Sequence, residues 1–169
     1  MKTPRLTLRN WTAEDRDSFA KLNSDPEVMW DLGGPIDRAR SDAKFDRYVV
    51  AFEKHGFSRW VVEDSQGRFV GYTGVMPSDE NHPLGQHAEI GWRLARWAWG
   101  NGYATEAAQA SLKDLFARTK LLEILSYTSS DNSRSRAVME RVGLKRDASR
   151  DFVWYEKWHG LVWVAPRPH

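Results

Sequence analysis

The chain has 169 residues, 41% hydrophobic and 28% charged, a composition typical of a soluble globular domain. Its 25 Lys and Arg residues against 23 Asp and Glu leave a net charge of +2, too weak a bias to indicate nucleic acid as the main partner. The absence of cysteine excludes disulfides, thiolate metal sites and a cysteine nucleophile. No run of residues resembles a signal peptide or a membrane span, so we expect one cytoplasmic domain over residues 1–169 and no membrane partner.

The first half of the chain predicts strands and helices in alternation. Leu6 and Leu8 alternate with polar residues as in a half-buried strand. Thr12 is typical of a helix N-cap, and Asp25 before Pro26 is typical of a helix end. The expected elements are a strand at 5–9, a helix from 12 to 25, a loop at 26–37, a helix at 38–54 and a hairpin of strands at 57–63 and 69–76.

The second half predicts a βαβ arrangement, and therefore a mixed α/β sheet in which the last central strands pair in parallel. Gly143 stands where a left-handed helix C-cap belongs. The expected elements are a strand at 87–94, a glycine-containing connection at 97–102, a helix ending near 118, a strand at 122–129, a helix at 132–142 and a strand at 161–164.

The connection before the helix at 103–118 contains Gly100-Asn101-Gly102. Two glycines permit a tight turn and a close approach of the backbone to a ligand, and the first N–H groups of the helix are suited to a phosphate. The segment is not a Walker A motif, because no Lys-Ser/Thr pair follows, and not G-x-G-x-x-G, because the third position is Thr105. A tight strand-to-helix turn without a ligand is the alternative.

Four motifs in chain order resemble the GNAT N-acetyltransferase superfamily, and in particular its RimJ/RimL-like branch. The resemblance covers residues 3 to 147 and lies in Thr3–Arg9 (TPRLTLR), Glu89-Ile90-Gly91, Trp99–Ala107 (WGNGYATEA), and Asn132-x-x-Ser135 with Met139–Leu144 (MERVGL). It implies an α/β (α+β) fold with a mixed, mostly antiparallel sheet that splays between the fourth and fifth strands, flanked by about four helices. It also implies acetyl-CoA as co-substrate, without a metal.

The resemblance assigns the coenzyme A site to the splay and to the glycine connection. The backbone of Trp92 and Leu94 would pair with the pantetheine arm, and Asn132 would orient a pantetheine amide. The residues expected around the pyrophosphate are Trp97, Gly100, Asn101, Gly102, Tyr103, Ala104 and Thr105. The sequence departs from the family at Trp97, where the family has Gln or Arg, and at Met139, where many members have a Tyr that serves as the general acid.

Two residues are candidates for proton transfer. Glu89 shares one face of its strand with His87, Gly91 and Arg93, so it is the expected base, acting through water. The alternative is that Glu89 pairs with an arginine and only supports the sheet. Ser135 is the expected acid for the leaving thiolate in place of the missing Tyr, and its alternative is a helix cap.

Aromatic residues mark the expected acceptor site. The chain contains 9 Trp, and Trp30 and Trp154, together with His87, are the expected substrate contacts. The loop at 26–37 also carries Met29 and Leu32, which either form a binding wall or cap the core. The aromatic segment 151–158 either forms an acceptor wall or a contact in a homodimer.

The expected activity is transfer of an acetyl group from acetyl-CoA by direct attack of a primary amine, either a protein N-terminus or a small molecule. An acyl-CoA-binding regulatory module without catalysis is the alternative, motivated by Trp97 and Met139. RNA binding as the main activity is a third hypothesis, but the sequence lacks a basic cluster with interleaved aromatic residues.

Overall fold

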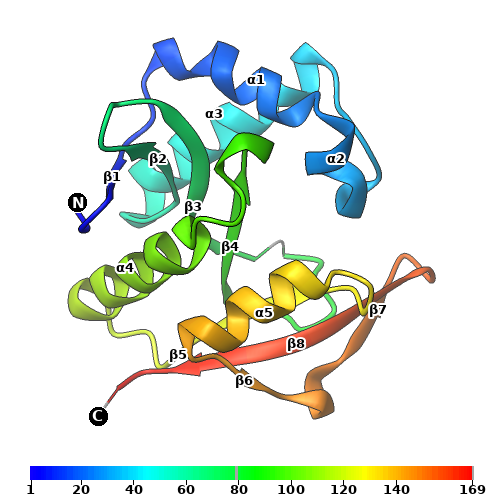
Figure 1. Ribbon diagram of the computed structural model, residues 1–169. Helices are drawn as coiled ribbons and strands as arrows, with labels where there is room; N and C mark the ends of the chain where they lie inside the picture. The colour runs from blue at the N-terminus through cyan, green and yellow to red at the C-terminus, as the bar shows by residue number, and fades with distance from the viewer. Residues whose placement is uncertain (79, 169) are drawn as a thin grey trace.

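The computed structural model describes residues 1–78 and 80–168 and contains one sheet with the strand order β1-β2-β3-β4-β5-β8-β6, with β7 paired to β8 (Figure 1). The strands are β1 (Leu6–Arg9), β2 (Arg59–Asp64), β3 (Phe69–Pro77), β4 (Ala88–Leu94), β5 (Glu123–Thr128), β6 (Lys145–Arg146), β7 (Phe152–Trp154) and β8 (Trp158–Pro166). The helices are α1 (Arg16–Asn23), α2 (Pro26–Met29), α3 (Arg38–His55), α4 (Tyr103–Arg118) and α5 (Ser133–Val142).

The sheet is antiparallel except at β4 and β5. Strand β4 pairs with β3 from Ala88 to Leu94, whereas its parallel pairing with β5 is confined, in the part of the chain that the structure describes, to Glu89 opposite Leu125. The two strands therefore diverge beyond Glu89, and one edge of the second half of β4 is left open. The predicted fold class and the splay between the fourth and fifth strands are both confirmed.

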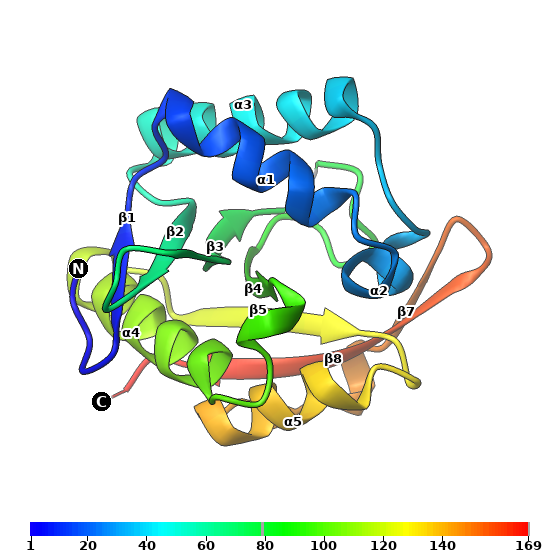
Figure 2. The ribbon, with the colours of Figure 1, turned by 45° about the horizontal axis from the view of Figure 1, so that its top comes forward.

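Helices cover both faces of the sheet (Figure 2). Helices α1 and α3 lie on one face, where Phe19 and Phe45 pack with Tyr48 and Tyr72 in a buried cluster. Helices α4 and α5 lie on the other face, where Leu115 and Met139 belong to a second cluster. The family's Tyr position, Met139, is thus a core position in this chain, only 1% exposed.

The structure differs from the expected elements in two segments. The region expected as a loop at 26–37 contains α2 and a 3-10 turn, Trp30–Leu32, because Asp25 caps the helix start through the N–H groups of Glu27 and Val28. Strand β8 is twice as long as the expected 161–164, and β6 and β7 were not expected. Strand β6 has only two residues and β7 has the sequence FVW, and each is a strand because it pairs with β8.

Candidate functional site: a groove along the splayed strands

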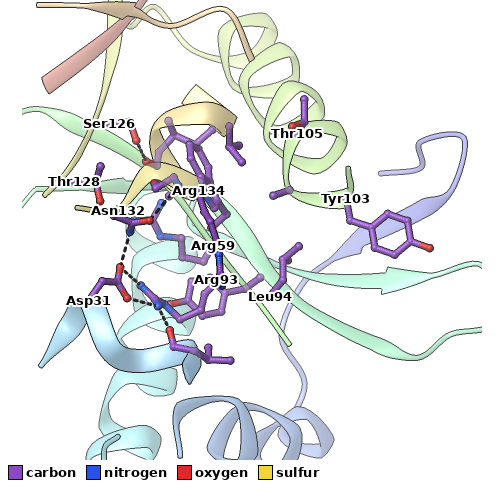
Figure 3. Close-up of a pocket in the computed structure, with 18 of the residues that line it drawn as sticks. Asp31, Arg59, Arg93, Leu94, Tyr103, Thr105, Ser126, Thr128, Asn132 and Arg134 are labelled. Carbon is purple, nitrogen blue, oxygen red and sulfur yellow. Dashed lines mark hydrogen bonds and ion pairs between the residues drawn. The ribbon is translucent and has the colours of Figure 1, made fainter. Parts of the chain in front are cut away.

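A groove with a volume of about 1970 Å³ follows the splay between β4 and β5 and continues to both faces of the sheet. Its walls come from the N-terminal segment, α2, α3, β2 to β5, α4, α5 and the β7–β8 turn, so distant parts of the chain meet there (Figure 3). We call the part beside α4 and α5 the nucleotide end and the part beside α2 and α3 the acceptor end.

The nucleotide end is built around the start of α4. Gly100 and Gly102 have φ angles of +79° and +75°, a backbone conformation that side chains other than glycine rarely adopt. Gly102 is the N-cap, and no side chain of the described residues caps this helix end. The uncapped N–H groups and the positive end of the helix dipole form a surface suited to an anion.

The N-terminal segment braces this loop. Glu106, in the first turn of α4, accepts hydrogen bonds from Thr3 Oγ1 at 2.6 Å and from Arg5 Nε at 2.7 Å. Burial raises the pKa of Glu106, but these hydrogen bonds outweigh it and hold the pKa below its ordinary value. Arg5 Nη1 also donates to the carbonyl oxygen of Asn101 at 2.8 Å. The motifs Thr3–Arg9 and Trp99–Ala107, which are far apart in the sequence, are therefore in direct contact.

The acceptor end contains a buried ion pair between Arg59 of β2 and Glu89 of β4, with 2.7 Å between Arg59 Nη2 and Glu89 Oε2. The Arg59 side chain is 8% exposed and that of Glu89 is 22% exposed. A Cβ on Gly91 would lie 2.9 Å from Arg59 Nη2, so any side chain at residue 91 would displace the guanidinium from its present position. The arginine partner that the sequence analysis held open for Glu89 is present, and Glu89 also lines the groove.

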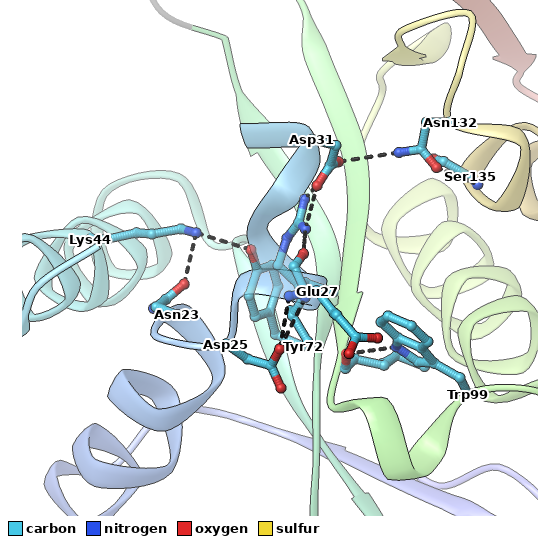
Figure 4. Close-up of polar contacts among 12 residues, drawn as sticks. Asn23, Asp25, Glu27, Asp31, Lys44, Tyr72, Trp99, Asn132 and Ser135 are labelled. Carbon is cyan, nitrogen blue, oxygen red and sulfur yellow. Dashed lines mark hydrogen bonds and ion pairs between the residues drawn. The ribbon is translucent and has the colours of Figure 1, made fainter. Parts of the chain in front are cut away.

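A second ion pair joins the two sides of the groove. Arg93 donates to both carboxylate oxygens of Asp31, at 2.8 and 3.1 Å, and also to the carbonyl oxygen of Val28. Asp31 Oδ2 in turn accepts from Asn132 Nδ2 at 3.2 Å (Figure 4). The chain Arg93–Asp31–Asn132 thus links β4, the 3-10 turn after α2 and the start of α5.

Asn132 and Ser135 meet at the start of α5. Asn132 Oδ1 accepts from the Ser135 backbone N–H at 3.1 Å, so Asn132 is the helix cap. The cap expected as an alternative role for the Ser135 hydroxyl is therefore supplied by its neighbour. Both residues line the groove.

Tyrosines surround the acceptor end. Tyr72 of β3 is 4% exposed and accepts a hydrogen bond from Lys44 Nζ at 3.2 Å. Burial raises the pKa of the Tyr72 hydroxyl, but the charges of Lys44 and Arg93 and a hydrogen bond with Tyr48 lower it to about 7. Burial raises the pKa of Tyr48 and Tyr127 above the ordinary value.

Most of the predicted contact residues line the groove. Those that do are Glu89, Trp92, Leu94, Gly100, Gly102, Tyr103, Ala104, Thr105, Asn132, Ser135, Trp30 and Trp154. The Leu94 carbonyl oxygen, expected to bind pantetheine, also accepts from Trp99 Nε1 at 2.9 Å. Trp30 is 46% exposed, whereas Met29 of the same segment is buried in the core, so the segment both caps the core and forms a wall.

Three predicted contact residues, Trp97, Asn101 and His87, are not among the residues that line the groove. Trp97 is 49% exposed and carries the Arg68 guanidinium over its ring at 4.6 Å. The Asn101 side chain donates to the carbonyl oxygens of Ala98 and Trp99 and so closes its own loop. His87 packs edge-on against Tyr127 and His82. These three residues are close in sequence to residues that line the groove, but their own side chains do not line it.

The sequence analysis did not identify several residues of the acceptor end as site residues. They are Asp31, Lys44, Arg47, Arg59, Tyr72 and Tyr127. Strand alternation in the sequence puts Tyr127 on the same face of β5 as Leu125, but the pairing of Leu125 with Glu89 is known only from the structure. Asp31 lies in the segment 26–37, which the sequence analysis considered as a possible binding wall. The other four residues lie on α3, β2 and β3, and nothing local in the sequence marks them as neighbours of β4.

The described residues contain no group of three His, Cys, Asp or Glu side chains arranged to hold a metal ion. Within the same part of the chain, no helix combines the length and apolar character needed to cross a bilayer.

Comparison with known proteins identifies the family. The model of the acetyltransferase (GNAT) domain matches residues 5–145. The chain belongs to the GNAT acetyltransferase family. The uncharacterized protein YkkB of Bacillus subtilis (strain 168) is 36% identical over 148 residues, which are 84% of this chain and 83% of YkkB.

Two further relatives of this GNAT protein bear on its activity and fold. The FsC-acetyl coenzyme A-N(2)-transacetylase of Aspergillus fumigatus is 32% identical over 152 residues, which are 85% of this chain and 64% of the relative. The crystal structure of the acetyltransferase from Agrobacterium tumefaciens str. C58 has a TM-score of 0.82 at 27% identity and covers 98% of this chain and 92% of its own.

RimL, a ribosomal L7/L12 α-N-protein acetyltransferase solved with coenzyme A, shares the fold with a TM-score of 0.75 at 14% identity, over 97% of this chain and 95% of RimL. The predicted enzyme class, an acetyl-CoA-dependent N-acetyltransferase, is confirmed by the family match and the relatives.

Proposed function

We propose that this protein transfers the acetyl group of acetyl-CoA to a primary amine by direct attack, with the coenzyme at the nucleotide end of the groove and the amine at the acceptor end. The observation that carries the proposal is the single continuous groove, which joins the uncapped start of α4 to the polar face of β4. One end is suited to a pyrophosphate and the other to proton transfer.

The coenzyme would be held mainly by the backbone. The N–H groups of the segment from Gly100 to Ala104 meet the pyrophosphate, and the open edge of β4 at Trp92 and Leu94 pairs with the pantetheine arm as another strand would. Arg134 stacks its guanidinium over the Trp99 ring at 4.3 Å and places a positive charge at the same end of the groove. These contacts fit a molecule with an anionic nucleotide and an extended amide arm.

In the transfer, the amine nitrogen attacks the thioester carbonyl carbon, a C–N bond forms and the C–S bond breaks. The nitrogen must lose a proton, and we assign this proton to Glu89 through water. Arg59 binds Glu89 Oε2, whereas Oε1 accepts no hydrogen bond from any residue that the structure describes. The leaving thiolate takes a proton from Ser135 or from solvent.

Thermal unfolding with and without acetyl-CoA is the first test. A ligand at about 100 times its dissociation constant adds roughly 2.7 kcal/mol. For a domain of this size, such an increase raises the midpoint by about 5–10 °C. The second test is turnover over a broad panel of primary amines, read as released thiol; the absence of cysteine removes any protein background.

Glu89→Gln and Ser135→Ala separate the two proton-transfer roles. Loss of the base should reduce kcat by about 100-fold or more, with the deficit shrinking as pH rises and more amine is neutral. Loss of Ser135 should cost only a few-fold in kcat, since a thiolate is a good leaving group. A midpoint shift with acetyl-CoA but no turnover of any amine would favour the acyl-CoA-binding regulatory module instead.

A further inference from the structure

Some charged side chains that line the groove are in ion pairs, whereas others have no oppositely charged partner among the described residues. Three of its carboxylates are each held by an arginine, in the pairs Arg5–Glu106, Arg59–Glu89 and Arg93–Asp31. Lys44 and Arg47 of α3 also line the groove, but none of the carboxylates among the described residues lies within ion-pair distance of either. The acceptor end therefore has an excess of positive charge that this part of the chain does not neutralise.

Lys44 extends from α3 into the acceptor end (Figure 4). Its Nζ donates to the hydroxyl of Tyr72 at 3.2 Å and to Asn23 Oδ1 at 3.3 Å, so neither of these partners is a carboxylate. Arg47 stands three residues further along the helix and so on the same face, with its guanidinium 5.9 Å from the centre of the Tyr48 ring. Two cations from one helix face thus reach the wall of the groove opposite α5.

The pKa of Tyr72 reflects the electrostatic potential beside Lys44. Burial alone raises the pKa of a phenol, yet the charges of Lys44 and Arg93, a hydrogen bond with Tyr48 and the charge of Arg59 together bring that of Tyr72 down to about 7. The positive charges that favour the ionised phenol also favour other anions at the same point. They disfavour a second cation there.

We propose that the acceptor amine carries a carboxylate, and that Lys44 and Arg47 bind this carboxylate at the α3 wall of the groove while the amine faces Glu89. This inference rests on the proposed transfer to an amine. Trp30 and Trp158 line the same end and provide apolar surface for the body of the molecule. The acceptor is then of the amino-acid class, and polyamines are poor acceptors because they bring positive charge to Lys44.

Matched pairs of acceptors test the proposal with the intact protein. L-Phenylalanine, L-methionine and L-leucine are each compared with their carboxamides, and spermidine serves as the polycation. The carboxamide has the less basic amine, so intrinsic reactivity favours it. We expect kcat/KM to be higher for the acids by about 10- to 100-fold, the effect of a hydrogen bond to a charged group.

Variants of α3 link this preference to Lys44. Lys44→Gln should reduce the preference for the acids several-fold, because only Arg47 is then left to bind the carboxylate, and Lys44→Arg should retain it. Lys54→Gln is the matched control, because it changes a lysine of the same helix that does not line the groove, and it should behave as the unaltered protein. The midpoint shift produced by acetyl-CoA should persist in all three variants, which shows that each is folded and that Lys44 does not hold the coenzyme.

The failures are distinguishable. Turnover of the carboxamides or of spermidine at rates equal to or above those of the acids overturns this inference and leaves the proposed function intact. A preference for the acids that Lys44→Gln leaves undiminished also overturns it. Turnover of no amine at all overturns the proposed function and this inference together.

Discussion

The two ends of the groove are built by different means. The nucleotide end relies on backbone conformation within one short segment, from Gly100 to the first turn of α4, braced by the N-terminal residues through Glu106. The acceptor end relies on side chains from α3, β2, β3, β4 and the turn after α2, held by the Arg59–Glu89 and Arg93–Asp31 pairs. A local motif can encode the first, but only the folded chain assembles the second.

Arg59→Met, at the acceptor end, should have the largest effect on the free energy of unfolding. This change leaves Glu89 without its partner in a mostly buried place, and loss of one member of a buried pair typically costs about 3–5 kcal/mol. Urea denaturation measures the loss, and thiol release should fall as well. Arg38→Met, which removes an exposed arginine paired with Asp17 and Asp42, is the control and should change little. Equal effects of the two changes would show that the Arg59–Glu89 pair has no special role.

Asp31→Asn should affect the acceptor end more than the nucleotide end, which Asp31 contacts only through Asn132. It removes the two-point contact with Arg93, and we expect kcat/KM for the amine to fall by about 10-fold or more. The midpoint shift with saturating acetyl-CoA should remain. Asp114→Asn, in an exposed pair with Arg118, is the control for loss of a carboxylate. An unchanged KM for the amine would contradict a role of Asp31 in shaping the acceptor end.

Gly102→Ala tests whether the start of α4, at the nucleotide end, binds acetyl-CoA. At φ +75° an alanine is strained by about 1–2 kcal/mol. Gly67→Ala carries the same strain at φ +74° in open space outside the groove. Both variants should lose similar stability, but only Gly102→Ala should weaken acetyl-CoA binding, measured by calorimetry. Equal coenzyme affinity in the two variants would argue against the helix start as the pyrophosphate site.

The smallest expected signal is the ionisation of Tyr72. Absorbance at the tyrosinate band should titrate with a midpoint near pH 7, and Tyr72→Phe should remove this step. Because the folded pKa lies below the unfolded one, this group stabilises the fold fully above the unfolded pKa of about 10. Its contribution decreases as pH falls from that value through the folded pKa, so the stability difference from Tyr72→Phe should grow between pH 7 and 10.

A carboxylate acceptor bound at Lys44 should also shift the Tyr72 titration to higher pH, whereas its carboxamide should not. Tyr103→Phe serves as the control, because Tyr103 lies at the nucleotide end and its loss should leave the step near pH 7 in place. A midpoint that stays near 10 in the unaltered protein would show that the positive field at the acceptor end is weak.

The sequence by itself determined the fold class, the hairpin of β2 and β3, most helix limits and the glycine turn before α4. These features depend on periodicity, on glycine at positive φ and on motifs within a few residues of each other, all of which are local properties. The face of β4 that carries Glu89, Gly91 and Arg93 also followed from strand alternation.

Only the tertiary structure decided which partners those residues have. Arg59 meets Glu89 across 30 residues of sequence, and Asp31 meets Asn132 across 101. It also placed Trp97, Asn101 and His87 outside the groove, although they adjoin residues that line it. Such contacts depend on how strands pair and helices pack, and a side chain's direction changes from one residue to the next along a strand. For this reason the sequence could predict the glycine turn at which we propose that the coenzyme binds, and it could not predict the charges that face the proposed acceptor.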